Sequence, residues 1–389
     1  MQERIRQWLQ IKRYNWRNYD FSLVVVVLIL SLISSYILSI ALPDDDFSLK
    51  RQAVALIGGL FVVFIFSIID YHDLCLYIPI IYILSTLMAA ATKFSPLGDD
   101  QSTGSYRWLD FKVIKFQPSE ICKIVVILAL ATFFFRSREH LKSFKNFFIA
   151  TAIAIVPTFF ILIQSDLSSS VVIMVVLIMM LLCSGIGRKV LGPIAAVVLP
   201  VIAFLFWYIQ QPSQILLHGY QLERIMGWLH PETEALGVMY QQNNSILSIA
   251  SGRLYGKLLE GTEMSRNYTS VDVIESDFIW APISEEFGFI GCIIILALLS
   301  IIIIKCFFVA KNAKDYLGMM IAIGISSMIC FQTFFNVGVA TSLLPNTGLP
   351  LPFLSNGLTS LLSNMMTIGI LLNIGIQPNR GSNSSFEIR

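Results

Sequence analysis

The stretch TSVDVIESDFIWAPISEEFGFIG occupies residues 269–291, and the chain continues from it directly into CIIILALLSIIII (292–304). Residues 282–304 are long and apolar enough to form an α-helix that crosses a membrane, which takes about 20 residues. Ionisable groups beside such a span usually face the interior of a helix bundle or a cavity. The stretch therefore predicts both a membrane fold and a site. Its carboxylates are Asp272, Glu275, Asp277, Glu285 and Glu286.

The composition of the whole chain supports a membrane fold. Of its 389 residues, 56% are hydrophobic and 13% are charged, whereas soluble proteins are about 25% charged. Charge is depleted because the hydrocarbon core has no water to solvate it, so we predict a polytopic membrane protein. The net charge of +2 is too small to indicate nucleic-acid binding. The six cysteines show no disulfide framework and no metal-ligand spacing.

We predict an all-α fold with ten transmembrane helices in one membrane domain covering residues 1–389. A span must satisfy every backbone polar group internally, which an apolar helix does. The basic first 20 residues lack a small-residue cleavage site, so the first span is expected to be a retained anchor. The predicted spans are 22–42, 53–69, 74–92, 119–135, 147–164, 167–183, 190–209, 282–304, 316–338 and 358–376.

The distribution of Lys and Arg predicts the orientation of these spans. With the N-terminus inside, the short cytoplasmic connections are the basic ones, and the long outer connections carry mixed charge. The N-terminal segment 1–20 and the tail 377–389 are then both cytoplasmic. The longest connection, residues 210–281, is predicted to be an extracytoplasmic loop between the seventh and eighth helices.

Two further segments on the predicted outer side are unusual. Residues 93–118 include GSYRWLDFKVIKFQP, and residues 339–357 are VATSLLPNTGLPLPFLSNG. The second is too rich in Pro and Gly for a helix and too apolar for open water, so we expect it to pack on protein at the membrane surface. The informative polar residues gather on this side, and we expect the function there.

The sequence FQPSEICKI (116–124) begins the fourth predicted span. Pro118 suits the first turn of a helix, and Glu120 is favoured there by the helix dipole. A well-formed helix start therefore accounts for Gln117, Pro118 and Glu120. It does not account for Lys123, one turn from Glu120 and already at membrane depth. Lys123 either forms an internal ion pair with Glu120 or is a cation held for an anionic ligand.

Arg107 and Asp166 each have a structural and a functional interpretation. Arg107 adjoins Trp108, and a basic anchor beside an interfacial aromatic residue is the leading explanation. Arg also binds phosphate through its planar fork, so a lipid diphosphate headgroup is the alternative. Asp166 lies in QSDLSSS (164–170) just before the sixth span, where Asp is usually an N-cap. Lining a site is its alternative role.

Asp277 lacks an equally good structural explanation. Pro282 marks a helix start, and Glu285 in the first turn is favoured by the helix dipole. Asp277 instead lies between Ser276 and the apolar Phe278, in the loop before that helix. Burial there raises the pKa of a carboxylate toward the range useful for a general base. Taken alone, a solvated loop carboxylate is the commoner explanation.

Six separated motifs, in this order, resemble the SEDS family (shape, elongation, division and sporulation), which includes RodA and FtsW. The resemblance extends over nearly the whole chain, and YNWRNYDFSL (14–23) favours the RodA side. The motifs are GSYRWLD (104–110), FQPSEICK (116–123), QSDLSSS (164–170), GYQLERIMGWLHPE (219–232), ESDFIWAPISEEFGFIG (275–291) and NVGVATSLLPNTGLPLPFLSNG (336–357).

The resemblance implies ten transmembrane helices with cytoplasmic termini and a peptidoglycan glycosyltransferase that polymerises lipid II at the outer face of the bacterial cytoplasmic membrane. It also implies a class B penicillin-binding protein as partner. In the family motif (T/S)DFIF the Asp is catalytic, and Asp277 in SDFIW matches it. The chain departs from the family at Ser165 and Ser168 (family QPDLGT) and at Asn356 and Leu358 (family FISYGGSS). These departures bear on substrate handling.

Asp277 is then expected to accept the proton of the attacking sugar hydroxyl. The departing diphosphate needs positive charge, or a Mg²⁺ or Mn²⁺ ion held through oxygen ligands by Asp277 and Glu120. Alternatively Glu120 orients Lys123. A lipid II flippase or transporter and a non-catalytic scaffold for a penicillin-binding protein are the other function classes. The candidate substrate-binding residues are Arg107, Lys123, Glu120, Gln117, Arg51, Arg224 and Asp166.

Overall fold

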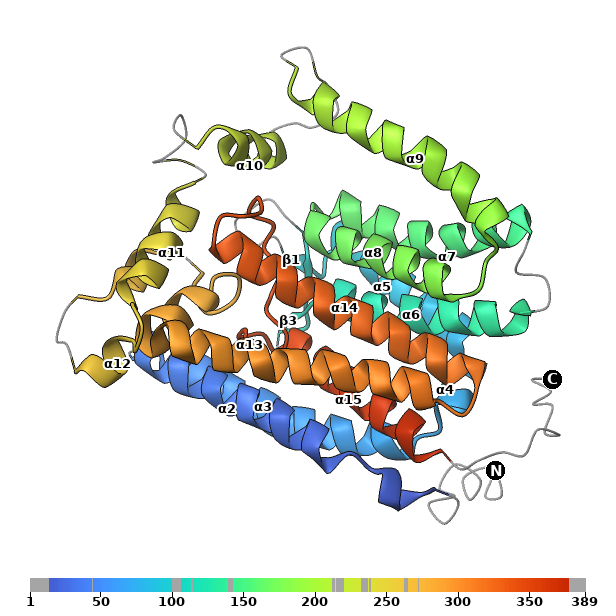
Figure 1. The fold of residues 1–389 in the computed structure, drawn as a ribbon, viewed down its shortest axis with the longest axis horizontal. Coiled ribbons are helices and arrows are strands. Elements are labelled where there is room, and N and C mark those ends of the chain that lie inside the picture. Colours follow the sequence, from blue (N-terminus) through green and yellow to red (C-terminus); the bar gives the residue numbers. More distant parts are fainter. Residues whose placement is uncertain are drawn as a thin grey trace.

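A computed structural model shows the chain as a bundle of helices (Figure 1). It describes residues 14–43, 45–99, 106–112, 115–138, 143–211, 214, 220–231, 237, 239–261, 265–271 and 273–377. Most of segment 1–20 and nearly all of the tail 377–389 thus lie outside the described residues. In chain order the elements are η2 (Trp16–Asn18), α2 (Phe21–Ala41), α3 (Asp46–Ile68), α4 (Tyr71–Leu76), α5 (Ile78–Phe94), β1 (Gly98–Asp99), β2 (Trp108–Asp110), β3 (Lys115–Phe116), α6 (Pro118–Arg136), α7 (Phe144–Ile163), α8 (Leu167–Cys183), α9 (Arg188–Ile209), α10 (Tyr220–Leu229), α11 (Tyr240–Ser251), α12 (Lys257–Glu260), η4 (Asn267–Ser270), α13 (Trp280–Asn312), α14 (Tyr316–Ala340) and α15 (Leu358–Ile376).

The prediction of a mostly helical membrane protein is confirmed. Among the described residues, eight helices are long and apolar enough to cross a membrane, and two more apolar helices, α5 and α8, are shorter. Each of the ten predicted spans overlaps one of these helices. The eight are α2, α3, α6, α7, α9, α13, α14 and α15.

Three predicted boundaries were wrong. The second span starts earlier, because α3 runs from Asp46 through the polar residues before 53. The third is divided into α4 and α5, since Pro79 lies at the start of α5 and a residue that precedes proline is disfavoured in helical geometry. The eighth ends later, because α13 continues to Asn312 instead of 304. Since α13 begins at Trp280, Glu285 lies beyond its first turn and the helix-dipole explanation for it fails.

The helix α13 also contains a break that the sequence analysis did not predict. Gly288 has left-handed backbone geometry (φ 64°) inside the element. Beyond it, the N–H groups of Phe289 and Ile290 donate to the carbonyls of Arg253 (2.9 Å) and Leu254 (3.2 Å) instead of continuing the helical pattern. The short first part of α13 is therefore attached to the α11–α12 turn.

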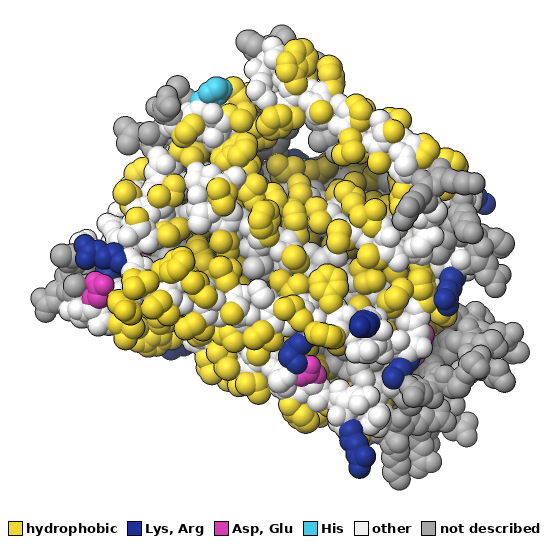
Figure 2. All heavy atoms as spheres, viewed as in Figure 1, with side chains coloured by type: hydrophobic (Ala, Val, Ile, Leu, Met, Phe, Trp, Pro, Cys, Tyr) yellow, Lys and Arg dark blue, Asp and Glu magenta, His cyan; other side chains and the backbone are white. Residues whose placement is uncertain are grey.

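The centre of the bundle is formed by α6, α14 and α15, whose apolar stretches are largely buried, whereas α9 is almost wholly exposed. α14 packs on α6, α8 and α13, and α15 packs on α3. Figure 1 shows α9 standing apart from the other long helices. Apolar side chains cover most of the face seen in Figure 2, and basic side chains lie mainly toward its edges. Such a surface suits contact with lipid.

One end of the bundle joins the first and last helices of the described chain. The backbone N–H of Asn15 donates to the carbonyl of Ile376 (2.8 Å). Lys305 near the end of α13 pairs with Asp20, the N-cap of α2, at 2.6 Å. Segments that were predicted to be cytoplasmic therefore meet at one end.

The same end holds a buried histidine between two carboxylates. The ring nitrogens of His72 lie 2.7 Å from Asp70 and 2.5 Å from Asp315. Although burial lowers the pKa of His72, the bonds to Asp315 and Asp70 outweigh it and raise the pKa above its ordinary value. His72 thus connects α4 to the start of α14 through its two carboxylate partners.

The opposite end carries the predicted outer segments. Residues 98–116 contain a small antiparallel sheet in which β2 pairs with β1 and β3, with Leu109 opposite Gly98 and Phe116. Residues 210–281 are not an open loop, because they contain α10, α11, α12 and η4. The apolar 339–357 segment packs on protein as predicted, with Leu349, Leu351 and Phe353 buried.

Candidate functional site

The loop that carries Asp277 is fixed by hydrogen bonds to α14 and to the segment between α14 and α15. The side-chain amide of Asn336 donates to the backbone carbonyls of Asp277 (2.9 Å) and Leu349 (2.8 Å). The N–H of Asn356 donates to the carbonyl of Glu275 (2.7 Å). A side-chain amide on α14 and a backbone N–H of the apolar 339–357 segment therefore hold the loop of Asp277 in one conformation.

The carboxylate of Asp277 lies directly against Gly348. A Cβ added to Gly348 would be 3.0 Å from Oδ2 of Asp277, closer than most Cβ contacts. Gly348 also has a φ of +75°, a conformation in which glycine avoids a steric penalty. Glycine therefore suits this position twice, through its backbone geometry and through the space it leaves for the carboxylate.

The surroundings of Asp277 suit a general base. Burial raises the pKa of this carboxyl group above its ordinary value. A hydrogen bond from Ser276 (3.2 Å to Oδ1) and the positive charges of Arg107 and Arg224 act in the opposite direction but do not cancel the rise. The side chain remains partly exposed, so a ligand can reach it. The two arginines place positive charge beside the carboxylate.

Arg107 links the small sheet to the turn between α7 and α8. It directly precedes β2, and its Nη2 donates to the carbonyl of Ser165 (2.7 Å). Ser165 has a φ of +62°, which is rare for a residue with a side chain. The expectation of Arg107 as a simple interfacial anchor is therefore incomplete, since its guanidinium group binds a strained turn and acts on two carboxylates, Asp166 and Asp277.

Asp166 is the N-cap of α8, as its position predicts. Its Oδ1 accepts from the N–H of Ser169 (3.0 Å) and the hydroxyl of Ser168 (2.9 Å). Although burial raises the pKa of Asp166, the charge of Arg107 and these hydrogen bonds outweigh it and hold the pKa below its ordinary value. Arg107 thus acts on one carboxylate that stays ionised and on another, Asp277, whose pKa is raised. Environments that separate two pKa values in this way are typical of acid–base sites.

Gln117 belongs to the same network. It is the N-cap residue of α6 and directs its Nε2 to Oδ2 of Asp166 (3.4 Å), which also accepts from the hydroxyl of Ser119 (2.9 Å). Its own N–H points to the hydroxyl of Thr359 on α15 (3.4 Å). The starts of α6, α8 and α15 therefore converge near Arg107.

Glu120 and Lys123 form the internal ion pair that was one of the two interpretations for them. Nζ of Lys123 lies 2.8 Å from Oε1 of Glu120, and both side chains are almost fully buried. The hydroxyl of Ser363 on α15 contacts the other carboxylate oxygen at 3.3 Å. The positive charge of Lys123 is thus already balanced within α6.

The remaining two candidates differ in their surroundings. Arg224 on α10 is half-buried, and its Nη1 donates to the carbonyl of Asn346 (3.2 Å), two residues from Gly348. Trp228 on the same helix donates to the carbonyl of Ser342 (3.2 Å), which fixes α10 over the α14–α15 segment. Arg51 lies exposed in the early part of α3.

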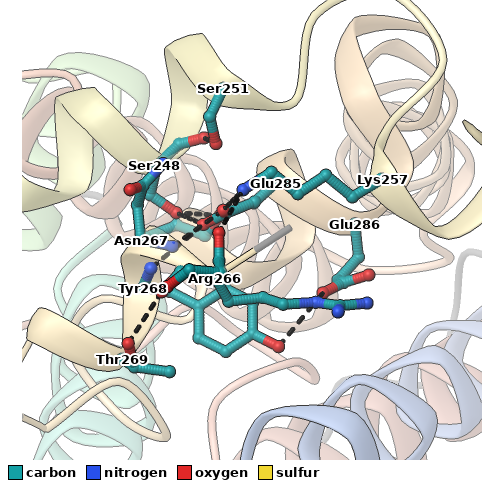
Figure 3. Close-up of polar contacts among 11 residues, drawn as sticks. Ser248, Ser251, Lys257, Arg266, Asn267, Tyr268, Thr269, Glu285 and Glu286 are labelled. Atoms are coloured by element: carbon teal, nitrogen blue, oxygen red, sulfur yellow. Dashed lines mark hydrogen bonds and ion pairs between the residues drawn. The ribbon is translucent and has the colours of Figure 1, made fainter. Parts of the chain in front are cut away.

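Sequence reasoning missed the partners of Glu285 and Glu286 (Figure 3). Glu285 is fully buried, forms an ion pair with Lys257, and accepts from the hydroxyl of Ser248 (2.6 Å). Glu286 accepts from Nε of Arg266 (3.1 Å). Nothing local in the sequence indicates that residues 28 and 20 positions apart pair with each other.

The two-carboxylate metal site expected from Asp277 and Glu120 does not fit this arrangement. Glu120 is neutralised by Lys123 on its own helix. Within the part of the chain that the structure describes, no three His, Cys, Asp or Glu side chains gather as a metal site. A divalent cation at Asp277 would have to take most of its ligands from water and a phosphate-bearing ligand, as Mg²⁺ often does.

The fold and site define a polytopic membrane protein with a carboxylate–arginine centre at one end of the bundle. Residues 17–380 match the FtsW/RodA/SpoVE family, described as "Cell cycle protein". The chain belongs to this family.

Relatives of known name cover nearly the whole chain. The peptidoglycan glycosyltransferase MrdB of Escherichia coli (strain K12) is 30% identical over 359 residues, covering 92% of this chain and 93% of the relative. Stage V sporulation protein E of Bacillus subtilis (strain 168) is 31% identical over 365 residues, covering 91% and 96%.

Solved structures share the fold. One, described as "Structural coordination of polymerization and crosslinking by a peptidoglycan synthase complex", superposes with a TM-score of 0.75 at 24% identity, covering 92% of this chain and 97% of the other. The rod shape determining protein RodA of Thermus thermophilus superposes with a TM-score of 0.65 at 22% identity, covering 93% and 98%.

Proposed function

We propose that this chain is a peptidoglycan glycosyltransferase that polymerises lipid II into β-1,4-linked glycan strands. The observation that carries the proposal is the state of Asp277, a partly buried carboxylate with a raised pKa beside Arg107 and Arg224. Membership of the FtsW/RodA/SpoVE family and the names of the relatives agree with it. The role belongs to cell elongation, division or sporulation, the processes after which the family's members are named.

Asp277 acts as the general base. Chain growth requires the 4-hydroxyl of one sugar to attack the anomeric carbon of another, and a hydroxyl is a poor nucleophile until its proton is accepted. Because the α-linked donor becomes a β-linked product, the reaction inverts the anomeric configuration. The contact of the carboxylate with Gly348, and the bond from Asn336 to the backbone carbonyl of Asp277, hold this residue for the transfer before substrate arrives.

Arg107 and Arg224 stabilise the departing polyprenyl diphosphate. Negative charge develops on the leaving oxygen in the transition state, and cations already in place lower its energy without reorganisation. Both guanidinium groups already act electrostatically on Asp277. Lys123 is a weaker candidate for this role because Glu120 balances its charge, and Arg51 is weaker because it is exposed.

A divalent cation, Mg²⁺ or Mn²⁺, remains part of the proposal, but with one protein carboxylate as its ligand instead of two. Of the two carboxylates proposed for it, Asp277 is left to contact the ion, together with diphosphate oxygens, since Glu120 is engaged by Lys123. Such an ion supplies positive charge to a diphosphate when bound. The roles proposed for Asp277, Arg107 and Arg224 do not depend on this ion.

The proposed topology has ten membrane spans with both termini in the cytoplasm and the 210–281 segment outside, in the bacterial cytoplasmic membrane. The Asp277 end then faces outward. Figure 2 shows a hollow between the α9 region and the bundle, with largely apolar walls in view. A prenyl chain fits such a surface while the sugars reach water. A class B penicillin-binding protein that cross-links the strands is the proposed partner, in keeping with the synthase complex that shares this fold.

The test is polymerisation of purified lipid II by the full-length chain in lipid nanodiscs, with and without the cross-linking partner. Wild-type protein is expected to make long glycan, and Asp277→Ala is expected to make none while folding and binding the partner normally. Absence of glycan synthesis by the wild-type protein, with normal partner binding, would leave a scaffold role, whereas synthesis by the Asp277→Ala variant at the wild-type rate would overturn the assignment of the base. Lipid II translocation across vesicles without polymerisation would indicate a transporter.

A further inference from the structure

Glu285 has a set of bonds that the proposed chemistry does not use. Its two carboxylate oxygens accept from the backbone N–H groups of Asn267 (2.8 Å) and Tyr268 (3.0 Å), in addition to Ser248 and Lys257. Its side chain is completely inaccessible to solvent. Figure 3 shows these donors converging on one carboxylate from α11, α12 and η4. A single residue of α13 therefore binds three other elements.

The first turns of α13 and the α11–α12 region approach too closely to leave room for side chains at three glycines. A Cβ on Gly288 would lie 2.3 Å from the nitrogen of Gly256, and one on Gly256 would lie 2.1 Å from the carbonyl oxygen of Glu286. A Cβ on Gly252 would be 2.0 Å from the carbonyl oxygen of Ser284. The first turns of α13 thus lie directly on the backbone of the α11–α12 region, and the break at Gly288 separates them from the rest of the helix.

The loop directly before these first turns carries the base. Asp277 lies three residues before Trp280, where α13 begins. Beside it, Phe278 and Ile274 pack with Tyr268 of η4 in a small apolar cluster. The η4 segment therefore contacts both the loop of Asp277, through this cluster, and Glu285, through its backbone N–H groups.

We propose that the Glu285–Lys257 ion pair is a positioning device for Asp277. It locks the α11–α12–η4 unit onto the first turns of α13, so that the carboxylate of Asp277 stays against Gly348 and near Arg107. This inference rests on the proposed function, because it assigns Asp277 the role of base. Glu285 and Lys257 contact no substrate and act only through the loop that they hold.

The test compares Glu285→Gln, Lys257→Met and the double variant in full-length protein in lipid nanodiscs, with lipid II as substrate. Each single change leaves one buried member of a charge pair without its counter-charge, whereas the double change removes both. We expect each single variant to lower kcat by roughly 10–100-fold, since a misplacement of about 1 Å at a reacting group has that effect. We expect KM for lipid II to change by less than about threefold and the double variant to recover most of kcat.

The pH dependence separates positioning from simple destabilisation. If the loop is loosened, water reaches Asp277 and the pKa of its carboxyl group falls. The decline of kcat at acid pH, which is the acid limb of the pH profile, then moves to lower pH in the single variants. A merely structural pair lowers the amount of folded protein but leaves kcat per folded molecule and the position of the acid limb unchanged, and that result overturns the proposal. Lys305→Met is the control, because Lys305 lies on the far part of α13 and pairs there with Asp20, the N-cap of α2. The Lys305→Met variant is expected to keep the wild-type kcat and the wild-type position of the acid limb.

Asp277→Asn is measured in the same assay to separate the two proposals. If it is inactive while the single variants at 257 and 285 keep wild-type kcat and pH dependence, only the positioning role fails. If Asp277→Asn polymerises at the wild-type rate, the assignment of the base fails first.

Discussion

Gly348 and Asp277 lie in contact across 71 residues of sequence, and a Cβ at position 348 would be 3.0 Å from Oδ2 of the carboxylate. We predict that Gly348→Ala lowers kcat by roughly 10–100-fold, because the methyl group displaces the carboxylate and displacement at a reacting group is costly. The left-handed conformation adds about 1–2 kcal/mol of strain. Polymerisation of lipid II and thermal unfolding are measured together.

Gly185→Ala is the matched control for this change. Gly185 has a similar φ of +82° but no atom within 4 Å of an added Cβ. It carries the same conformational strain without touching the site, so its kcat is expected to stay at the wild-type value. An equal loss of kcat in both variants contradicts the contact with Asp277.

The second prediction concerns the pH dependence of Asp277. Because folding raises its pKa, the native state holds this proton more tightly than the unfolded chain. The stability from protonation is present below the unfolded pKa and is lost as pH rises through the native one. Activity requires the ionised form, so kcat is expected to decline at acid pH with an apparent pKa above that of an ordinary aspartate.

Asp277→Asn should therefore separate activity from stability. We expect it to lower kcat by about 10²–10⁴-fold, the range typical of a lost general base. At neutral pH it should unfold at a higher temperature than wild type, because a buried charge has been removed. A lower unfolding temperature at neutral pH contradicts the raised pKa.

The third prediction concerns Arg107. Its removal in Arg107→Met takes positive charge away from Asp166 and Asp277, so both pKa values rise and the acid limb of kcat moves to higher pH. We expect kcat itself to fall by about 10²–10³-fold if Arg107 stabilises the leaving group. Lys115→Met removes an exposed cation from the same small sheet, where it pairs with Asp99, and is expected to change neither quantity.

The fourth prediction decides between the two roles of Lys123. Glu120→Gln or Lys123→Met leaves one buried charge unpaired and should destabilise the protein by about 3–5 kcal/mol. The double variant should regain most of this stability and keep polymerising if the pair is internal. A stable double variant with a strongly raised KM for lipid II would instead show that Lys123 binds the substrate. Unfolding in detergent and steady-state kinetics give the two readouts.

The sequence predicted the helices well because the requirement for a membrane span is local. An apolar run of sufficient length is helical whatever its neighbours are, and α8 and α15 begin and end as predicted. The same local logic gave Asp166 as an N-cap and Pro118 at the start of α6. It failed between α4 and α5, where a proline interrupts the predicted span, and at Gly288, where contact with a distant backbone does so.

Within the candidate site, the sequence by itself determined which residue types were available: a carboxylate before an apolar helix, arginines in the outer segments and an acid–base pair one turn apart on α6. Only the tertiary structure decided which of them meet. Arg107 and Ser165 are 58 residues apart and Lys257 and Glu285 are 28 apart. Their contacts depend on how helices pack, and packing is settled by the summed fit of many apolar side chains, which no short stretch of sequence contains.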